Sequence, residues 1–257
     1  MSRALLWIFA GLFTVSITAL ASAPAVWLVP LIDAQTDGRF SLADVQGSLW
    51  QGSAVIGAAA ARDDVLTPLL PGRCVWRISP WVMIGMLDIR LENEAISSAP
   101  INIHGDWSRL KVEAGNISLP ADGLAALGAP LNTIRPAGLM RASWPTLTVT
   151  RTGRNWQING QVQIDLTQMM SALSPVKPLG AYRVQLDLLR GSTRLNLQTL
   201  SGPLHLTGKG NISDGSLKFS GQAWAQEGEE ARLSGLLNLL GQRRQVENRN
   251  VIALEFQ

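Results

Sequence analysis

The residue types that most often carry acid–base or metal chemistry are scarce in this chain. The sequence contains two histidines, His104 and His205, and one cysteine, Cys74. Neither histidine has an aspartate, glutamate or cysteine at a spacing typical of metal ligands, and both occupy polar positions of alternating apolar and polar runs. We therefore expect both to be solvated strand residues. Cys74 has no histidine nearby in the sequence, which favours a small buried side chain over a nucleophile.

Carboxylates and serines give no stronger indication of catalysis. Asp63 and Asp64 are adjacent, and neighbours on an extended chain point to opposite faces, so they do not converge on one substrate atom. Ser48 and Ser53 lie among glycines, but their spacing differs from the Gly-x-Ser-x-Gly pattern of a nucleophile elbow. We expect no catalytic residue, no cofactor and no metal, and therefore no enzyme.

Tryptophan is the conspicuous residue type instead. A tryptophan ring contributes a large apolar area and keeps one N–H group that needs a partner. Such rings either pack within the sheet or line an exposed apolar groove that meets lipid or a partner protein, and the sequence leaves both alternatives open. The candidates outside the amino-terminal apolar run are Trp50, Trp76, Trp81, Trp107, Trp144, Trp156 and Trp224.

The composition bounds the class of protein. The chain has 257 residues, of which 46% are hydrophobic and 16% charged, so it can bury a core and is not disordered by composition. The net charge of +3 is small for this length, and no basic stripe with interleaved aromatic residues occurs. We therefore expect no nucleic-acid partner.

The amino terminus predicts a membrane anchor. No charged residue occurs from Ala4 to Ile32, and roughly 20 apolar residues are enough to cross a bilayer as a helix. A secretory signal peptide is the alternative, because residues 21–23 resemble a small-residue cleavage site. The apolar run continues beyond that site, and Pro24 follows it directly, which favours an uncleaved anchor over residues 1–32.

Charges flanking the apolar run predict its orientation. Arg3 lies before the run, whereas Asp33, Asp37 and Arg39 after it give a net negative flank. The positive-inside rule then places the short tail in the cytoplasm and residues 33–257 on the other side of the membrane.

Period-two alternation dominates the rest of the sequence and is typical of strands with one buried and one wetted face. Glycine, asparagine and proline turns such as Asn159-Gly160 separate these runs. We expect a mainly β fold, an elongated, curved antiparallel sheet treated as one domain over residues 33–257. The clearest strand predictions are residues 101–104, 110–114, 147–150, 162–165, 184–187, 195–198, 204–207 and 217–220.

Two segments interrupt the alternation and predict short helices. Residues 120–128 and 166–173 are rich in alanine, leucine and methionine, and each is followed by a proline. The two segments also belong to an internal quasi-repeat, which relates residues of about 115–145 to about 160–190.

Five short motifs, placed in order behind the apolar run, resemble the type II secretion system protein N family. The motifs are Gly47-Ser-Leu-Trp-Gln-Gly52, Trp76-Arg-Ile-Ser-Pro80, Pro178-Leu-Gly-Ala-Tyr-Arg183, Leu200-Ser-Gly-Pro-Leu-His-Leu-Thr-Gly208 and Leu236-Leu-Asn-Leu-Leu-Gly241. Each motif is weak by itself, and the resemblance rests on their order along nearly the whole chain.

The resemblance implies a bacterial inner-membrane protein that crosses the membrane once, with a cytoplasmic amino terminus and its bulk in the periplasm. It implies an accessory role in exporting folded proteins across the outer membrane, with other inner-membrane or periplasmic secretion components as partners and without catalytic residues. The strand-repeat pattern is also similar to periplasmic AsmA-like proteins, so a lipid-binding or lipid-transfer module with an apolar groove is the alternative function.

Overall fold

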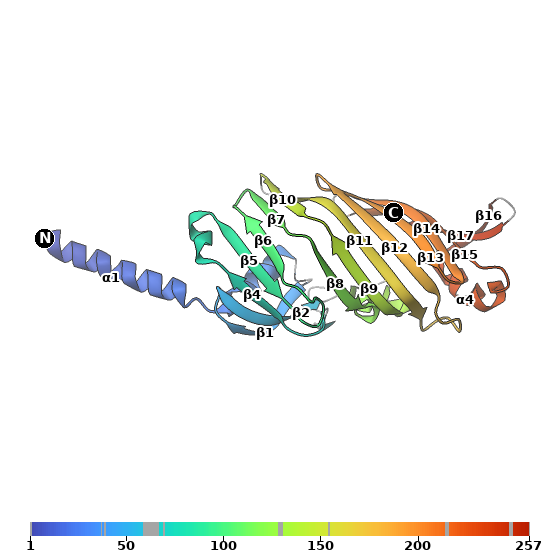
Figure 1. The fold of residues 1–257 in the computed structure, drawn as a ribbon, viewed down its shortest axis with the longest axis horizontal. Coiled ribbons are helices and arrows are strands. Elements are labelled where there is room, and N and C mark those ends of the chain that lie inside the picture. The colour runs from blue at the N-terminus through green and yellow to red at the C-terminus, as the bar shows by residue number, and fades with distance from the viewer. Residues whose placement is uncertain are drawn as a thin grey trace.

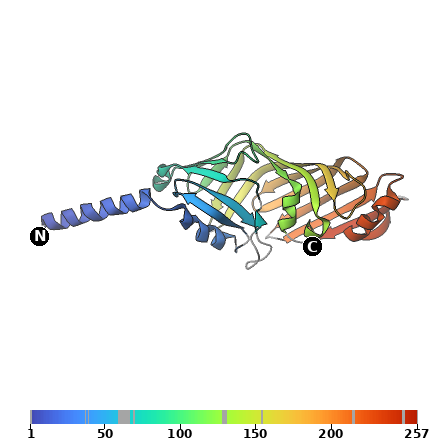
Figure 2. The same cartoon turned by 90° about the horizontal axis from the view of Figure 1, so that it is seen from below.

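The chain folds mainly into β-strands. The computed structural model describes residues 2–36, 38, 40–58, 67–68, 70–127, 131–153, 155–213, 216–246 and 249–256. Its strands form a 17-stranded antiparallel sheet that is long in one direction and curved, and α1 (Ser2–Ala21) projects from one end (Figures 1 and 2). The predicted mainly β fold with a large antiparallel sheet is confirmed.

Seven of the eight strand predictions lie within strands, and the prediction for residues 110–114 extends two residues beyond the end of β7 at Val112. The strands are β1 (Phe40–Gly47), β2 (Gln51–Ala58), β3 (Thr67–Pro68), β4 (Cys74–Ile78), β5 (Leu87–Glu92), β6 (Ile101–Gly105), β7 (Arg109–Val112), β8 (Gly115–Pro120), β9 (Pro136–Trp144), β10 (Leu147–Thr152), β11 (Asn155–Ser171), β12 (Gly180–Leu189), β13 (Ser192–Ser201), β14 (Leu204–Ser213), β15 (Ser216–Ala225), β16 (Gln242–Val246) and β17 (Arg249–Phe256). The remaining helices are η1 (Ala25–Trp27), α2 (Leu28–Gln35), η2 (Pro80–Ile84), η3 (Ala121–Leu127), α3 (Leu131–Ile134) and α4 (Glu230–Leu240).

The long strand β11 joins two halves of the sheet. In the first half the pairing runs β1-β2-β4-β5-β6-β7-β10-β11, with the short β3 also paired to β2. In the second half it runs β8-β9-β11-β12-β13-β14-β15-β17-β16. Along its length β11 therefore pairs first with β10 and then with β9. The two halves of the sheet are joined through this one strand.

One face of the sheet is apolar from end to end. Residues that pair directly across antiparallel strands share a face. A series of apolar side chains lies on this face from β5 to β13. It follows the strand register through β6, β7, β10, β11 and β12. The series is Ile89, Ile103, Val112, Leu147, Val149, Ile158, Val162, Leu186 and Leu195.

Helices cover this apolar face at both ends of the sheet. At the amino-terminal end Ala25 packs against Ala54 and Trp76. At the carboxy-terminal end Leu233 and Leu236 of α4 lie in a larger core with strand residues of β14, β15 and β17. Between the two ends, the apolar residues of β5 to β13 are mostly half-buried.

The apolar amino-terminal run is divided rather than one long helix. α1 ends at Ala21, and Pro24 takes an extended conformation before η1 and α2 begin, because proline lacks an N–H donor and restricts the residue before it. Ala23 and Ala25 are buried, and Ala25 packs against Ala54 and Trp76, so this part of the apolar run lies against the sheet. Within the described part of the chain, no helix is both long enough and apolar enough to cross a membrane.

Of the two helices predicted inside the sheet region, one is confirmed and one is wrong. Residues 120–128 contain η3, although Gly128 lies outside the described residues. Residues 166–171 instead continue β11, where Leu166 pairs with Tyr182 on one side and Met140 on the other. Pairing on both edges outweighs the helix propensity of leucine and methionine. The residues of the predicted quasi-repeat include the strand pairs β8–β9 and β11–β12, and the repeat itself stays a prediction.

Candidate interaction surfaces

The seven candidate tryptophans occupy three kinds of environment. Trp76 is buried, Trp50, Trp144 and Trp224 are half-buried, and Trp81, Trp107 and Trp156 are exposed. Packing and open surface, the two alternatives that the sequence leaves, therefore apply to different members of the set.

Trp76 and Trp144 pack over glycines of neighbouring strands. A Cβ atom built on Gly52 would lie 2.5 Å from ring atom Cζ2 of Trp76, and one built on Gly115 would lie 3.0 Å from the same atom of Trp144. The indole N–H of Trp76 donates to the carbonyl of Leu49 over 3.1 Å, and that of Trp144 donates to a backbone carbonyl over 2.9 Å. Both rings thus lie close to the backbone only because glycine leaves the space.

Trp50 connects the sheet to the amino-terminal helix. It lies in the turn between β1 and β2, and its indole N–H donates to the carbonyl of Leu20, in the last turn of α1, over 2.8 Å. Beside it, the backbone N–H of Leu49 donates to the carbonyl of Ala23 over 2.8 Å. Carbonyls in the last turn of a helix lack partners in regular helical geometry, and the Leu20 carbonyl accepts both the Trp50 indole N–H and, over 3.3 Å, the backbone N–H of Ala23.

Trp224 and Trp156 are each paired with another side chain. His205 stacks on Trp224, with ring centroids 5.2 Å apart and planes inclined by 5°, across the β14–β15 pair. His205 is therefore half-buried and covered on one side by an indole. The guanidinium of Arg151 lies 5.9 Å from the ring centroid of Trp156, across the β10–β11 pair.

Trp81 and Trp107 stand on two loops at the same edge of the sheet. Trp81 belongs to η2, between β4 and β5, and Trp107 lies in the turn between β6 and β7. Alternate turns of an antiparallel sheet fall on the same edge, and a Cβ built on Gly85 would lie 3.7 Å from Cδ1 of Trp107. The two loops are therefore in close proximity. Further exposed apolar residues of the first loop are Met83, Ile84 and Met86.

His104 lies between two carboxylates that its sequence spacing does not reveal. Its Nδ1 is 3.2 Å from Asp88 Oδ1, and its Nε2 is 3.2 Å from Glu113 Oε1. Asp88 is the residue opposite His104 in the β5–β6 register. The side-chain amide of Asn102 donates to Glu113 over 2.8 Å and is the main cause that holds the Glu113 pKa below its usual range. Among the described residues, no group of three or more His, Cys, Asp or Glu residues could hold a metal ion.

Three other residues considered for catalysis, Cys74, Ser48 and Ser53, form hydrogen bonds with neighbouring residues of the sheet region. Cys74 is half-buried, and its sulfur accepts a hydrogen bond from an asparagine side chain over 3.4 Å. Ser48 and Ser53 both form hydrogen bonds with nearby residues. Asp63 and Asp64 lie outside the described residues.

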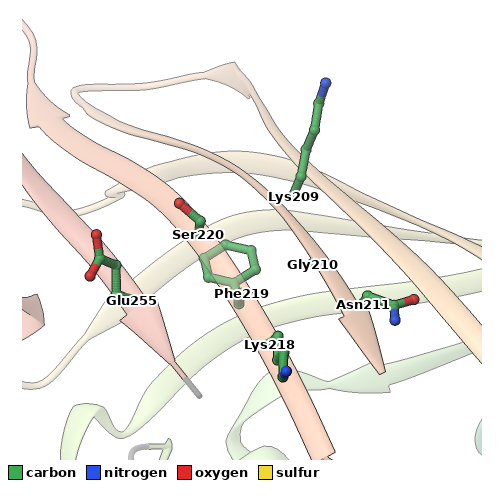
Figure 3. A pocket seen from close by; sticks show the side chains of 7 residues that line it. All are labelled: Lys209, Gly210, Asn211, Lys218, Phe219, Ser220 and Glu255. Atoms are coloured by element: carbon green, nitrogen blue, oxygen red, sulfur yellow. The ribbon is translucent and has the colours of Figure 1, made fainter. Parts of the chain in front are cut away.

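A shallow depression of about 500 Å³ lies over β14, β15 and β17. Figure 3 shows Lys209, Ser220 and Glu255, which pair directly across these three strands and share a face, and beside Ser220 the ring of Phe219, which packs against the carboxy-terminal core. That ring lies against Gly208, Gly210 and Gly221. Glu255 is 3.1 Å from Arg244, so the lining offers polar contacts on a nearly open surface.

Comparison with known proteins identifies the family. The model for type II secretion system protein N matches residues 38–251, which include almost the entire sheet. Searches of curated proteins and of solved structures found no match. Because the matched segment covers most of the chain, the protein belongs to the type II secretion system protein N family.

Proposed function

We propose that the protein is a non-catalytic accessory component of the type II secretion system that works through contacts with other inner-membrane or periplasmic components. The family match over residues 38–251 carries this proposal, because it includes nearly all strands that could offer contact surface. The half-buried and exposed tryptophans are the candidate contact residues.

The proposal includes attachment to the inner membrane by the amino-terminal segment, with the sheet in the periplasm. The absence of charge from Ala4 to Ile32 supports it, as does the projection of α1 away from the sheet (Figure 1). The apolar residues of α1 are strongly exposed, between 63% and 79% for Trp7, Ile8, Phe9, Leu12, Phe13 and Val15. Exposed apolar area of this extent is stabilised in lipid rather than in water.

Secretion from intact cells tests the proposed function. Deleting the gene should leave secretion substrates in the periplasm, and the full chain should restore their export. A chain lacking residues 1–21 but directed to the periplasm should restore less. Normal export without the gene would contradict the accessory role, whereas full restoration by the shortened chain would contradict the need for attachment.

A lipid-binding or lipid-transfer function is the second candidate. The continuous apolar face, half-buried between the two covered ends, favours it because acyl chains could lie along such a face. Ile164→Lys or Leu195→Lys should remove phospholipid that copurifies with the protein, whereas Gln163→Lys on the opposite face should not. Protein without extractable phospholipid would contradict this function.

A further inference from the structure

Five exposed apolar residues form a patch, here called the interfacial patch, on the two loops that approach each other at one edge of the sheet. It comprises Trp81, Met83, Ile84, Met86 and Trp107, whose exposed fractions lie between 54% and 68%. No charged residue occurs from Ile78 to Leu87. Monomeric soluble proteins rarely leave such residues together in water, so the patch indicates a binding surface.

The loop that carries most of the patch pairs its backbone groups internally. Within η2 and its flanks, the N–H of Gly85 donates to Val82 and that of Met86 donates to Trp81, both over 3.1 Å. Pro80 opens the helix without an N–H donor, and Gly85 closes it with a φ of 93°, a conformation that suits glycine. Backbone groups that are already paired can leave water at little cost, as a lipid environment requires.

The patch lies beside the apolar helix. Figures 1 and 2 agree that the β4–β5 loop stands at the end of the sheet from which α1 leaves. The hydrogen bond from Trp50 to Leu20 ties the end of α1 to this part of the sheet. A bilayer that holds the exposed apolar residues of α1 would therefore meet the same end of the molecule.

The composition of this edge matches the interface of a bilayer rather than its centre. Tryptophan prefers the level of the lipid headgroups, where its ring is apolar and its N–H stays wet. Arg109 and Arg151 are exposed beside the β6–β7 turn, and their strands meet where Arg151 N–H donates to Ser108 over 2.8 Å. The carboxylate of Asp106 in that turn accepts hydrogen bonds from the backbone N–H groups of Ser108 and Arg109. The exposed Arg109 guanidinium can therefore meet a lipid phosphate at this edge, whereas Arg151 lies over Trp156 and its Nε donates to the Gly153 carbonyl over 3.3 Å.

We propose that the interfacial patch inserts into the periplasmic leaflet of the inner membrane and holds the sheet in a fixed orientation against the bilayer. This inference rests on the proposed attachment by α1. It adds a second contact that attachment by one helix does not require, and it places β4 to β7 at the membrane and α4 away from it.

The test uses the full chain with Cys74→Ser and one new cysteine that carries an environment-sensitive fluorophore. Ile84→Cys places the label in the interfacial patch, and Leu239→Cys on α4 is the matched control, because Leu239 is also exposed but lies at the other end of the sheet. Both are reconstituted into vesicles of phosphatidylethanolamine and phosphatidylglycerol, with or without spin-labelled acyl chains, and recovered by flotation.

The proposal expects blue-shifted emission at residue 84, quenched by the spin-labelled lipids, and unshifted, unquenched emission at residue 239. If the protein floats with the vesicles but the label at residue 84 is neither shifted nor quenched, insertion of the patch is overturned and attachment by α1 stands. If the protein does not float, both are overturned. A shift at residue 84 that needs another secretion component and resists lipid quenching would overturn the bilayer as the occupant in favour of a protein.

Discussion

The two ends of the sheet differ in how far their apolar side chains are buried. At the carboxy-terminal end α4 buries Leu233, Leu236 and Leu237 against β14, β15 and β17. At the amino-terminal end the core is small, with Ala25, Ala54 and Trp76 as its buried members, while Trp81 and its neighbours stand outside. The same sheet thus ends in a closed core on one side and in an open apolar patch on the other.

The buried carboxy-terminal core stabilises the fold, whereas the exposed amino-terminal patch offers surface for contacts. Burial at the carboxy-terminal end stabilises the fold in proportion to the apolar area removed from water. Apolar residues at the amino-terminal end cannot contribute in that way until something covers them. Substitutions of the buried leucines of α4 should therefore lower stability, and substitutions of the exposed residues of the interfacial patch should affect association.

The largest expected effect is the loss of the buried leucine at the closed end. Leu233→Ala should lower the free energy of unfolding by about 2–5 kcal/mol, because Leu233 is fully buried and its removal leaves a cavity. Leu239→Ala, an exposed position of the same helix, should change it by less than about 0.5 kcal/mol. Urea unfolding of the full chain in mild detergent measures both. Equal effects at the two positions would contradict the assignment of the core to α4.

Two glycines, one near each end, should respond in opposite directions to the same substitution. Gly52→Ala places a Cβ 2.5 Å from Trp76 and 2.7 Å from the carbonyl of Gln46, so we expect a loss of about 1–3 kcal/mol. Gly235→Ala in α4 meets no atom within 4 Å and should add about 0.5–1 kcal/mol, because alanine favours a helix. A tolerated Gly52→Ala would contradict the packing of Trp76 on this strand. Unfolding midpoints in urea distinguish these outcomes.

The alternation of apolar and polar residues was enough to predict the strands, because a half-buried strand repeats every two residues. The same local signals failed at residues 166–173 and did not reveal α4. At the first site the partners of Leu166 come from β9 and β12, and pairing on both edges outweighs helix propensity. The division of the apolar run at Pro24 was visible in the sequence, since proline interrupts a helix, but hydropathy alone favoured one long span.

Whether a tryptophan packs in the sheet depends on partners that are distant in sequence. The glycines that receive Trp76 and Trp144 lie 24 and 29 positions away by residue number, at Gly52 and Gly115, and a strand glycine was the available signal for such close approach. For Trp81 the sequence offered a local indication of exposure, because the uncharged segment around Pro80 lies between two strands. The carboxylates around His104 come from neighbouring strands, so sequence spacing could not identify them.

Acid pH should weaken the second half of the sheet through one ion pair. Arg183 Nε donates to Asp165 over 2.6 Å and is the main cause that lowers the Asp165 pKa below its ordinary 3.8. The pair therefore contributes its full stability above that value and loses it as pH falls through the lower folded pKa. Asp165→Asn should cost about 1 kcal/mol at pH 7, reduced by partial exposure, and should flatten the acid limb. Gln161→Asn, on the same face of β11, is the control in urea unfolding at pH 7 and pH 3, and an unchanged acid limb in Asp165→Asn would exclude this pair as its cause.

The smallest expected effect lies where α1 meets the sheet. Trp50→Phe keeps most of the ring and removes the N–H that donates to the Leu20 carbonyl. That carbonyl also accepts the backbone N–H of Ala23 over 3.3 Å, so it keeps a partner and the loss should stay near 0.5 kcal/mol. Global unfolding would barely register such a change, but amide hydrogen exchange at residues 20–23 should rise, because the end of α1 then opens without unfolding the sheet. Exchange that rises equally in β14 would mean that Trp50 stabilises the whole sheet, and the two ends would then not be independent.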